Sequence, residues 1–279
     1  DIGLVLLDEG HCAPAKVFGV ACMLPSRAMV GLSGSLVRED DGIAALLTSV
    51  GPTLCTVGVR ELVCRGVLAD CVHAVHVVPC SAAATSELTN RDRRRVVASL
   101  DGPKLAFCIK LLRTDLADKH VIVFFDSLPG IHIFTDFLRT HAGDRFAIFD
   151  PLDGTTARDT RADTLAAFEN VDGAALLVIS RIGNEAIDFK TADAVVQMCQ
   201  SSGSRRDELQ RSGRVARLIN RRAKRQGASV HTIAIRGSSE MDFATRRAEY
   251  MCAIGMAARI VDEEETDEML LARESTVQL

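Results

Sequence analysis

The chain has 279 residues, of which 47% are hydrophobic and 25% are charged, with a formal net charge of −4 at pH 7. This length suits one large domain or two small ones, with enough apolar residues for a sizeable core. Because the net charge is slightly negative, contact with nucleic acid has to come from local basic patches and not from a global positive field. The nine cysteines form no C-x-x-C pair, which argues against a zinc site or a disulfide framework. No apolar run reaches the 18 or so residues that a membrane-spanning helix needs.

The N-terminal stretch places carboxylates at the end of an apolar strand. Residues 2–7 are continuously apolar and are followed by Asp8-Glu9-Gly10-His11. A buried parallel strand that ends in acidic residues is typical of ligand-binding edges in open α/β sheets. A second strand is predicted at 28–32, before a polar stretch that begins at Ser33. The chain opens on a strand without Met, so we expect it to be a piece of a longer protein.

From residue 103 onward, apolar runs of strand length alternate with segments of helical spacing. This alternation predicts a parallel sheet flanked by helices, an α/β fold. The predicted strands are 72–80, 121–126, 146–149, 174–180, 194–198 and 230–235. The predicted helices are 60–70, 105–116, 130–140, 156–168, a long basic helix after residue 203, and 238–259.

The basic helix carries a row of cations on one side. At 3.6 residues per turn, Gln210, Arg214, Arg217 and Arg221 fall on one face. Neighbouring guanidinium groups repel each other, so an anion is expected to face them. The alternative is a solvated basic helix without a ligand.

Three motifs in chain order resemble those of superfamily 2 helicases of the XPB type, which belong to the transcription and repair factor TFIIH. They are the D-E-x-H box at 8–11, the run Gly-Leu-x-x-x-Leu-Val-Arg-Glu-Asp-Asp at 31–41, and Gln-Arg-x-Gly-Arg-x-x-Arg at 210–217. The resemblance extends from Asp8 to about Leu271. It implies two RecA-like helicase lobes with parallel sheets flanked by helices, the first lobe partial and the second complete.

The resemblance also implies an ATP site with Mg²⁺ as cofactor. In such helicases Asp8 would hold Mg²⁺ through water, Glu9 would polarise the attacking water, and His11 would couple to the other lobe. The sixth motif would supply Arg214 and Arg217, which reach the γ-phosphate. The remaining residues implied at the catalytic and nucleotide sites are Gln210, Gly183 and Asp188.

DNA contacts are implied at three further places. A loop implicated in opening DNA corresponds to Arg38, Glu39 and Asp40, and a thumb-like insertion that grips DNA would include Arg93 and Arg94. A plain exposed helix explains the composition of the insertion equally well. The fifth motif, which begins with Ser180 and Arg181, adds the last predicted DNA contacts. The partners implied are DNA and other TFIIH-like subunits in the nucleus, with no zinc and no membrane.

Several departures from the family pattern favour a second hypothesis, a paralogue without hydrolysis that serves as a DNA-binding or TFIIH scaffold module. Gly34, Asn184 and Ser212 replace more typical family residues. No Gly-x-x-x-x-Gly-Lys-[Ser/Thr] phosphate loop occurs in the 279 residues, so this chain alone is not expected to hydrolyse ATP at a useful rate. A chromatin-remodelling translocase also carries D-E-G-H, but the sequence of its sixth motif differs from the one found here.

The predicted organisation follows from these motifs. Residues 1–62 are assigned to the C-terminal part of the first lobe, 63–260 to the second lobe, and 261–279 to an acidic mobile tail. Residues 69–259 are expected to fold independently, whereas residues 1–60 are not, because two strands cannot bury a core alone.

Overall fold

The structure is a computed structural model, and it describes residues 2–12, 18–34, 43–81, 100–180, 189, 191–198, 204–216, 227–264, 266 and 269. Inside these ranges, the side chains of residues 18, 43, 45, 206, 207 and 214 are not described. The chain divides into two compact units, Asp1–Gly58 with Ser204–Leu209, and Val59–Gly203 with Gln210–Leu279.

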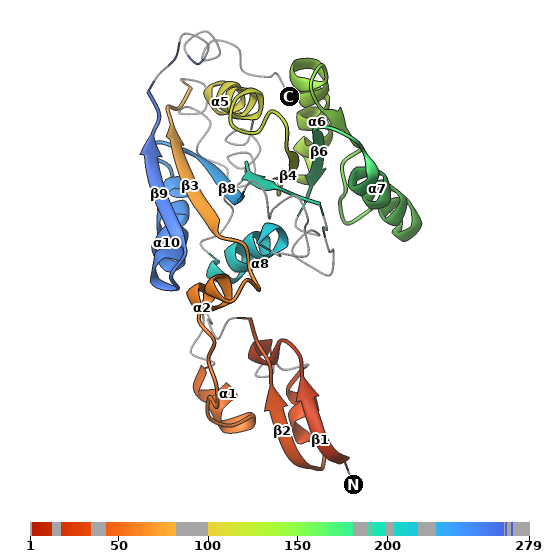
Figure 1. Cartoon of the computed structure of the whole chain (residues 1–279), viewed down its shortest axis with the longest axis vertical. Helices are drawn as coiled ribbons and strands as arrows, with labels where there is room; N and C mark the ends of the chain where they lie inside the picture. The colour runs from red at the N-terminus through yellow and green to blue at the C-terminus, as the bar shows by residue number, and fades with distance from the viewer. Residues whose placement is uncertain are drawn as a thin grey trace. The chain divides into compact units, whose positions relative to one another are not determined.

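The first unit contains a two-stranded parallel sheet of β1 (Ile2–Leu7) and β2 (Ser26–Gly31), drawn in red and orange-red in Figure 1. Two short 3-10 helices, η1 (Gly10–Cys12) and η2 (Phe18–Met23), lie between the strands in sequence, and α1 (Ile43–Ser49) follows. Apolar side chains of β1 stay exposed, with Leu6 62% accessible. A complete α/β sheet would cover both faces of such strands.

The second unit is built on a seven-stranded sheet in the order β5-β6-β4-β7-β8-β3-β9, in which every pairing is parallel. The predicted α/β fold with a parallel sheet is therefore confirmed. The strands are β3 (Cys71–Val78), β4 (His120–Phe124), β5 (Ala147–Ile148), β6 (Ala175–Ile179), β7 (Ala194–Gln197), β8 (Ala228–Ile235) and β9 (Ala257–Asp262).

Helices cover both faces of this sheet, which explains the continuous apolar runs of its central strands (Figure 1). Every residue of β4 and β6 is buried. One face packs against α5 (Gly102–Arg113) and α6 (Leu128–Ala142). The other face packs against side chains from the remaining helices. These are α7 (Arg158–Asn170), α8 (Arg205–Val215) through Val215, and α10 (Ser239–Ala253). Leu68 and Ala69, which follow the short helix α2 (Val59–Cys64), pack there as well.

The end of the chain differs from the prediction of a helix over 238–259. Helix α10 ends at Ala253, Gly255 takes a positive φ of 90°, and residues 257–262 form β9. Glycine is the residue that adopts this backbone conformation without strain, so it can turn the chain from the helix into an edge strand. Residues 261 and 262, assigned to the tail from sequence, are the last two of β9. The division into two lobes and a tail stays a prediction.

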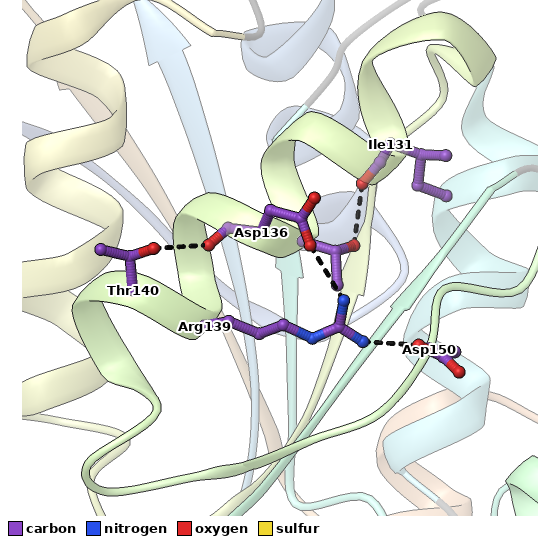
Figure 2. A network of polar contacts seen from close by, with 6 residues as sticks. Ile131, Asp136, Arg139, Thr140 and Asp150 are labelled. Atoms are coloured by element: carbon purple, nitrogen blue, oxygen red, sulfur yellow. Dashed lines mark hydrogen bonds and ion pairs between the residues drawn. The ribbon is translucent and has the colours of Figure 1, made fainter.

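An ion-pair network on α6 fixes the segment that follows β5 (Figure 2). Arg139 donates to Asp136 in its own helix at 2.9 Å and to Asp150 at 2.5 Å. The hydrogen bond to Asp150 raises the pKa of Arg139. Because these side chains are exposed, the network contributes on the order of 1 kcal/mol or less per pair. Its effect is therefore to orient the segment and not to hold the fold together.

Candidate nucleotide and nucleic-acid site

The turn after β1 brings two exposed carboxylates together. Asp8 accepts a hydrogen bond from the backbone N–H of Glu9 through Oδ1 at 2.9 Å. Glu9 has a φ of 50°, a left-handed conformation that side chains with a Cβ seldom adopt. Magnesium is usually held by one or two carboxylates together with water and substrate phosphates. The donor set of this turn therefore fits the predicted metal, since both side chains remain accessible to solvent.

His11 is buried beside this turn and joins it to the end of β2. Its Nδ1 lies 2.8 Å from the hydroxyl of Ser33 and 3.1 Å from Oε2 of Glu9. The side chain of His11 is only 5% exposed, whereas that of Glu9 is 50% exposed. The imidazole thus connects the carboxylate turn to Ser33, just after β2, within the same unit. The coupling of His11 to the other lobe stays a prediction.

Gly10 allows the turn to pass close to β2. Its N–H donates to Leu32 O at 2.7 Å, and Leu32 N–H donates back to Leu7 O at 2.8 Å. A Cβ at position 10 would lie 3.0 Å from the Cα of Gly31, which is tighter than nine in ten real Cβ contacts. Glycine therefore suits this backbone, and the D-E-G-H spelling has a local structural reason.

Helix α8 carries the predicted γ-phosphate motif. Gln210 is partly buried in this helix, and Arg214 lies one turn further along it. The side chain of Arg214 and the whole of Arg217 lie outside the described residues. The predicted contacts of both arginines with a γ-phosphate therefore stay predictions.

The first arginine of the same motif, Arg211, has a role that the sequence reasoning missed. Its side chain is 2% exposed and donates to both carboxylate oxygens of Asp126, at 2.9 and 3.2 Å. The guanidinium also lies over the ring of Phe124, 4.4 Å from the centroid. A buried guanidinium needs a carboxylate and further acceptors to offset its lost hydration. Arg211 therefore anchors α8 on the carboxyl end of β4.

Gln197, the last residue of β7, completes this buried cluster. Its Oε1 accepts a hydrogen bond from Nη1 of Arg211 at 3.2 Å and another from Nη1 of Arg247 in α10 at 3.3 Å. Gln197 is fully buried and Arg247 is 4% exposed. One amide oxygen thus joins two helices that are well separated in sequence. The buried residues 208, 211, 212 and 215 share one face of α8, but Glu, Arg, Ser and Val form no apolar stripe, so no sequence signal marked this cluster.

The other predicted site residues are only partly covered by the described ranges. Ser180 follows β6, is 4% exposed, and donates its backbone N–H to Leu152 O at 2.9 Å. This position at a carboxyl end of the parallel sheet is compatible with a ligand-binding edge. The residues that lie outside the described part of the chain are Arg38, Glu39, Asp40, Arg93, Arg94, Arg181, Gly183 and Asp188.

Two observations on the described residues concern groups of metal ligands and membrane-spanning helices. No group of three or more His, Cys, Asp or Glu side chains in the described ranges is arranged to hold a metal ion. No helix in the same ranges is long and apolar enough to cross a bilayer. His73 and His76 of β3, which the strand period places on opposite faces, are both buried within the sheet unit.

Comparison with known families identifies a match over most of the chain. The family model described as the ERCC3/RAD25/XPB C-terminal helicase matches residues 73–277. The general transcription and DNA repair factor IIH helicase/translocase subunit XPB/SSL2 of Saccharomyces cerevisiae is 28% identical over 263 residues, which is 93% of this chain and 30% of that protein. The DNA 3′-5′ helicase XPB of Kineococcus radiotolerans is 27% identical over 271 residues, 96% of this chain and 46% of that protein.

Solved structures agree on the fold. The DEAD-box helicase Mss116 bound to single-stranded RNA and UDP-BeF aligns with a TM-score of 0.61 at 16% identity, covering 99% of this chain and 52% of that one. At such identity the likeness shows the RecA-like fold alone. The chain spans less than half the length of the two curated relatives above. On the match over residues 73–277, the chain belongs to the ERCC3/RAD25/XPB helicase family.

Proposed function

We propose that the protein is an ATP-dependent DNA helicase or translocase of XPB type that opens DNA in nucleotide excision repair and transcription initiation. In this proposal it works in the nucleus with other TFIIH-like subunits. The names of the relatives support the proposal, since they describe helicase/translocase subunits of a transcription and DNA repair factor. The relative from Kineococcus radiotolerans is named as a DNA helicase.

The observation that carries the proposal is the turn of Asp8 and Glu9. Asp8 accepts a hydrogen bond from the backbone of Glu9, and His11 contacts both Glu9 and Ser33. Bound magnesium would neutralise negative charge on the phosphates of ATP. In this site Asp8 would hold the ion, and Glu9 would orient the attacking water and take up its proton. The buried imidazole keeps Glu9 in place through the 3.1 Å contact.

The positive charge required at the transferring phosphate comes from α8 in this proposal. Arg214 and Arg217 act on the charge that develops in the transition state, where such arginines are worth roughly 10³–10⁵ in rate. Gln210 is proposed to contribute a hydrogen bond at the same place, and Gly183 and Asp188 to contact the nucleotide. The proposed DNA contacts are Arg38, Glu39, Asp40, Arg93, Arg94, Ser180 and Arg181.

The test is Glu9→Gln in the natural full-length protein, with DNA-stimulated ATP hydrolysis as the assay. Loss of a positioned base lowers kcat by roughly 10²–10⁴-fold, while binding of ATP and DNA is retained. The matched control is Glu61→Gln in α2, because Glu61 is 45% exposed and pairs with Arg65 in the next turn. Turnover of the Glu61 variant should equal that of the unsubstituted protein.

Two results would contradict the proposal. Equal turnover of the Glu9 and Glu61 variants would mean that Glu9 does not act in the reaction. An unsubstituted full-length protein that binds DNA and ATP without turnover would identify the alternative, a scaffold module that has lost hydrolysis.

A further inference from the structure

The buried cluster of Asp126, Gln197, Arg211 and Arg247 is not used by the chemistry proposed for the ATP site. It nevertheless lies on the helix that carries the γ-phosphate motif. Besides α8, three elements contribute to it, since Asp126 follows β4, Gln197 ends β7, and Arg247 belongs to α10. Arg211 is the member contributed by α8.

We propose that Gln197 and Arg247 are positioning residues for hydrolysis, which hold Arg211 and thereby set the orientation of α8. The inference rests on the proposed function, because it concerns how the arginines of α8 are presented. Neither Gln197 nor Arg247 is proposed to touch the nucleotide. Their effect passes through the 3.2 Å and 3.3 Å hydrogen bonds that meet at one amide oxygen.

Helix geometry explains why Arg211 is a sensitive anchor. Arg214 is three residues further along α8, and residues three apart are neighbours on a helix surface. A helical turn rotates as a unit. A small rotation of α8 at Arg211 therefore turns position 214 through a similar angle. A misplacement of about 1 Å in a catalytic group can cost about 10²-fold in rate. The anchor therefore controls a quantity to which hydrolysis is sensitive.

The chemistry of the cluster explains why an amide suits position 197. Two guanidinium groups share one oxygen, so the oxygen must accept twice and carry no donor proton toward either group. Asp126 already supplies a carboxylate to Arg211 at 2.9 Å. The amide oxygen adds a second, neutral acceptor at Nη1, whereas Asp126 accepts from Nη2 of the same guanidinium. Arg211 is thereby held at both terminal nitrogens, which restricts its rotation more than the ion pair alone.

Helix α10 gives this acceptor a fixed support. Glu240 at the start of α10 forms an ion pair at 2.8 Å with the fully buried Lys104 of α5. Ser238 caps the same helix by accepting a hydrogen bond from Glu240 N–H at 3.2 Å. Arg247 lies two turns further along this anchored helix. The support of α8 thus extends from α10 through Gln197 to Arg211.

The experiment uses the natural full-length protein with Gln197→Leu, Gln197→Glu and Glu263→Gln. Leucine removes the shared acceptor, glutamate keeps it, and Glu263→Gln weakens the 2.6 Å contact between Glu263 and His76, which belongs to the same unit but not to the support of α8. Two quantities are measured for each variant: kcat and KM for ATP, and hydrogen exchange of the α8 amides. Exchange reports local opening without requiring activity.

The expected result is that Gln197→Leu lowers kcat about 10- to 100-fold with KM within about 2-fold, and speeds exchange in α8. Gln197→Glu should restore both quantities toward the unsubstituted values. Glu263→Gln should lower thermal stability without either change. Arg247→Lys serves as a second variant if Gln197→Leu does not fold, and it should shift kcat and exchange in the same direction.

The proposal is overturned if Gln197→Leu and Glu263→Gln change kcat and α8 exchange equally, because the cluster would then be only structural. Parallel measurement of Arg214→Ala separates this failure from failure of the proposed function. Loss of turnover in Arg214→Ala with full turnover in Gln197→Leu overturns the positioning role alone. Full turnover in Arg214→Ala overturns the proposed role of the arginine, while exchange in α8 still decides the anchoring by Gln197.

Discussion

Substitution of Asp126 by Ala should destabilise the sheet unit by about 3 kcal/mol. The side chains of Arg211 and Asp126 are 2% and 7% exposed, so the substitution leaves a guanidinium buried without its carboxylate. Removing one partner of a buried ion pair typically costs about 3–5 kcal/mol. The lower end applies here because Gln197 still accepts a hydrogen bond and the Phe124 ring still faces the cation at 4.4 Å.

The measurement is urea unfolding followed by far-UV circular dichroism, because the chain has no tryptophan and one tyrosine. For a domain of about 200 residues, 3 kcal/mol corresponds to a fall in Tm of roughly 6–12 °C. The double variant Asp126→Ala/Arg211→Met should recover most of the loss, since an apolar side chain needs no counter-charge. Asp144→Ala is the control, because its pair with Arg113 is exposed and should cost about 1 kcal/mol or less.

The reasoning would be refuted by either of two results. A loss below about 1 kcal/mol for Asp126→Ala would mean that the Arg211 ion pair is not buried as described. A double variant whose loss equals the sum of the two single losses would mean that the two side chains do not interact.

Two further predictions concern the sheet unit. Limited proteolysis should leave a protected core from about residue 69 through β9, whose last backbone contact is at Glu263. Early cuts are expected before residue 69, and equal protection of residues 1–60 would contradict this. Burial, with a smaller effect of His76, lowers the pKa of His231 from 6.5 to about 3. The unfolded chain therefore binds this proton first, and stability should fall as the pH drops from about 6.5 toward 3. His231→Gln should flatten that part of a plot of Tm against pH, and an unchanged slope would exclude His231 as its cause.

The sequence predicted best those strands that are buried on both faces, because such strands are apolar at every position. β4 and β6 are apolar at every position because helices cover both faces of the sheet, so their runs are unmistakable. β9 was assigned to a helix because it lies at the sheet edge and mixes exposed and half-buried residues, including Arg259. Such a strand carries a weak pattern, and its pairing with β3 depends on a chain segment about 180 residues away.

The candidate site was predictable only where chemistry and sequence position coincide. The carboxylates of Asp8 and Glu9 directly follow a predicted strand, so their place at the carboxyl end of that strand could be predicted. Arg211 was grouped with the basic character of its helix, whereas the structure buries it against Asp126. Whether an arginine faces solvent or a carboxylate depends on tertiary partners that lie 85 residues away in the chain, which no local pattern encodes.

The strand order of the sheet sets the time at which the domain can close during synthesis. β3 is the first strand of the sheet to be made, yet both of its neighbours, β8 and β9, are the last. The buried pair His76 and His231 is separated by 155 residues. At roughly 5–20 residues per second, β3 waits about 8–30 seconds on the ribosome before its partner strand exists. During that interval an apolar strand with two unpaired edges is open to other chains, so chaperone supply should limit the yield of folded protein.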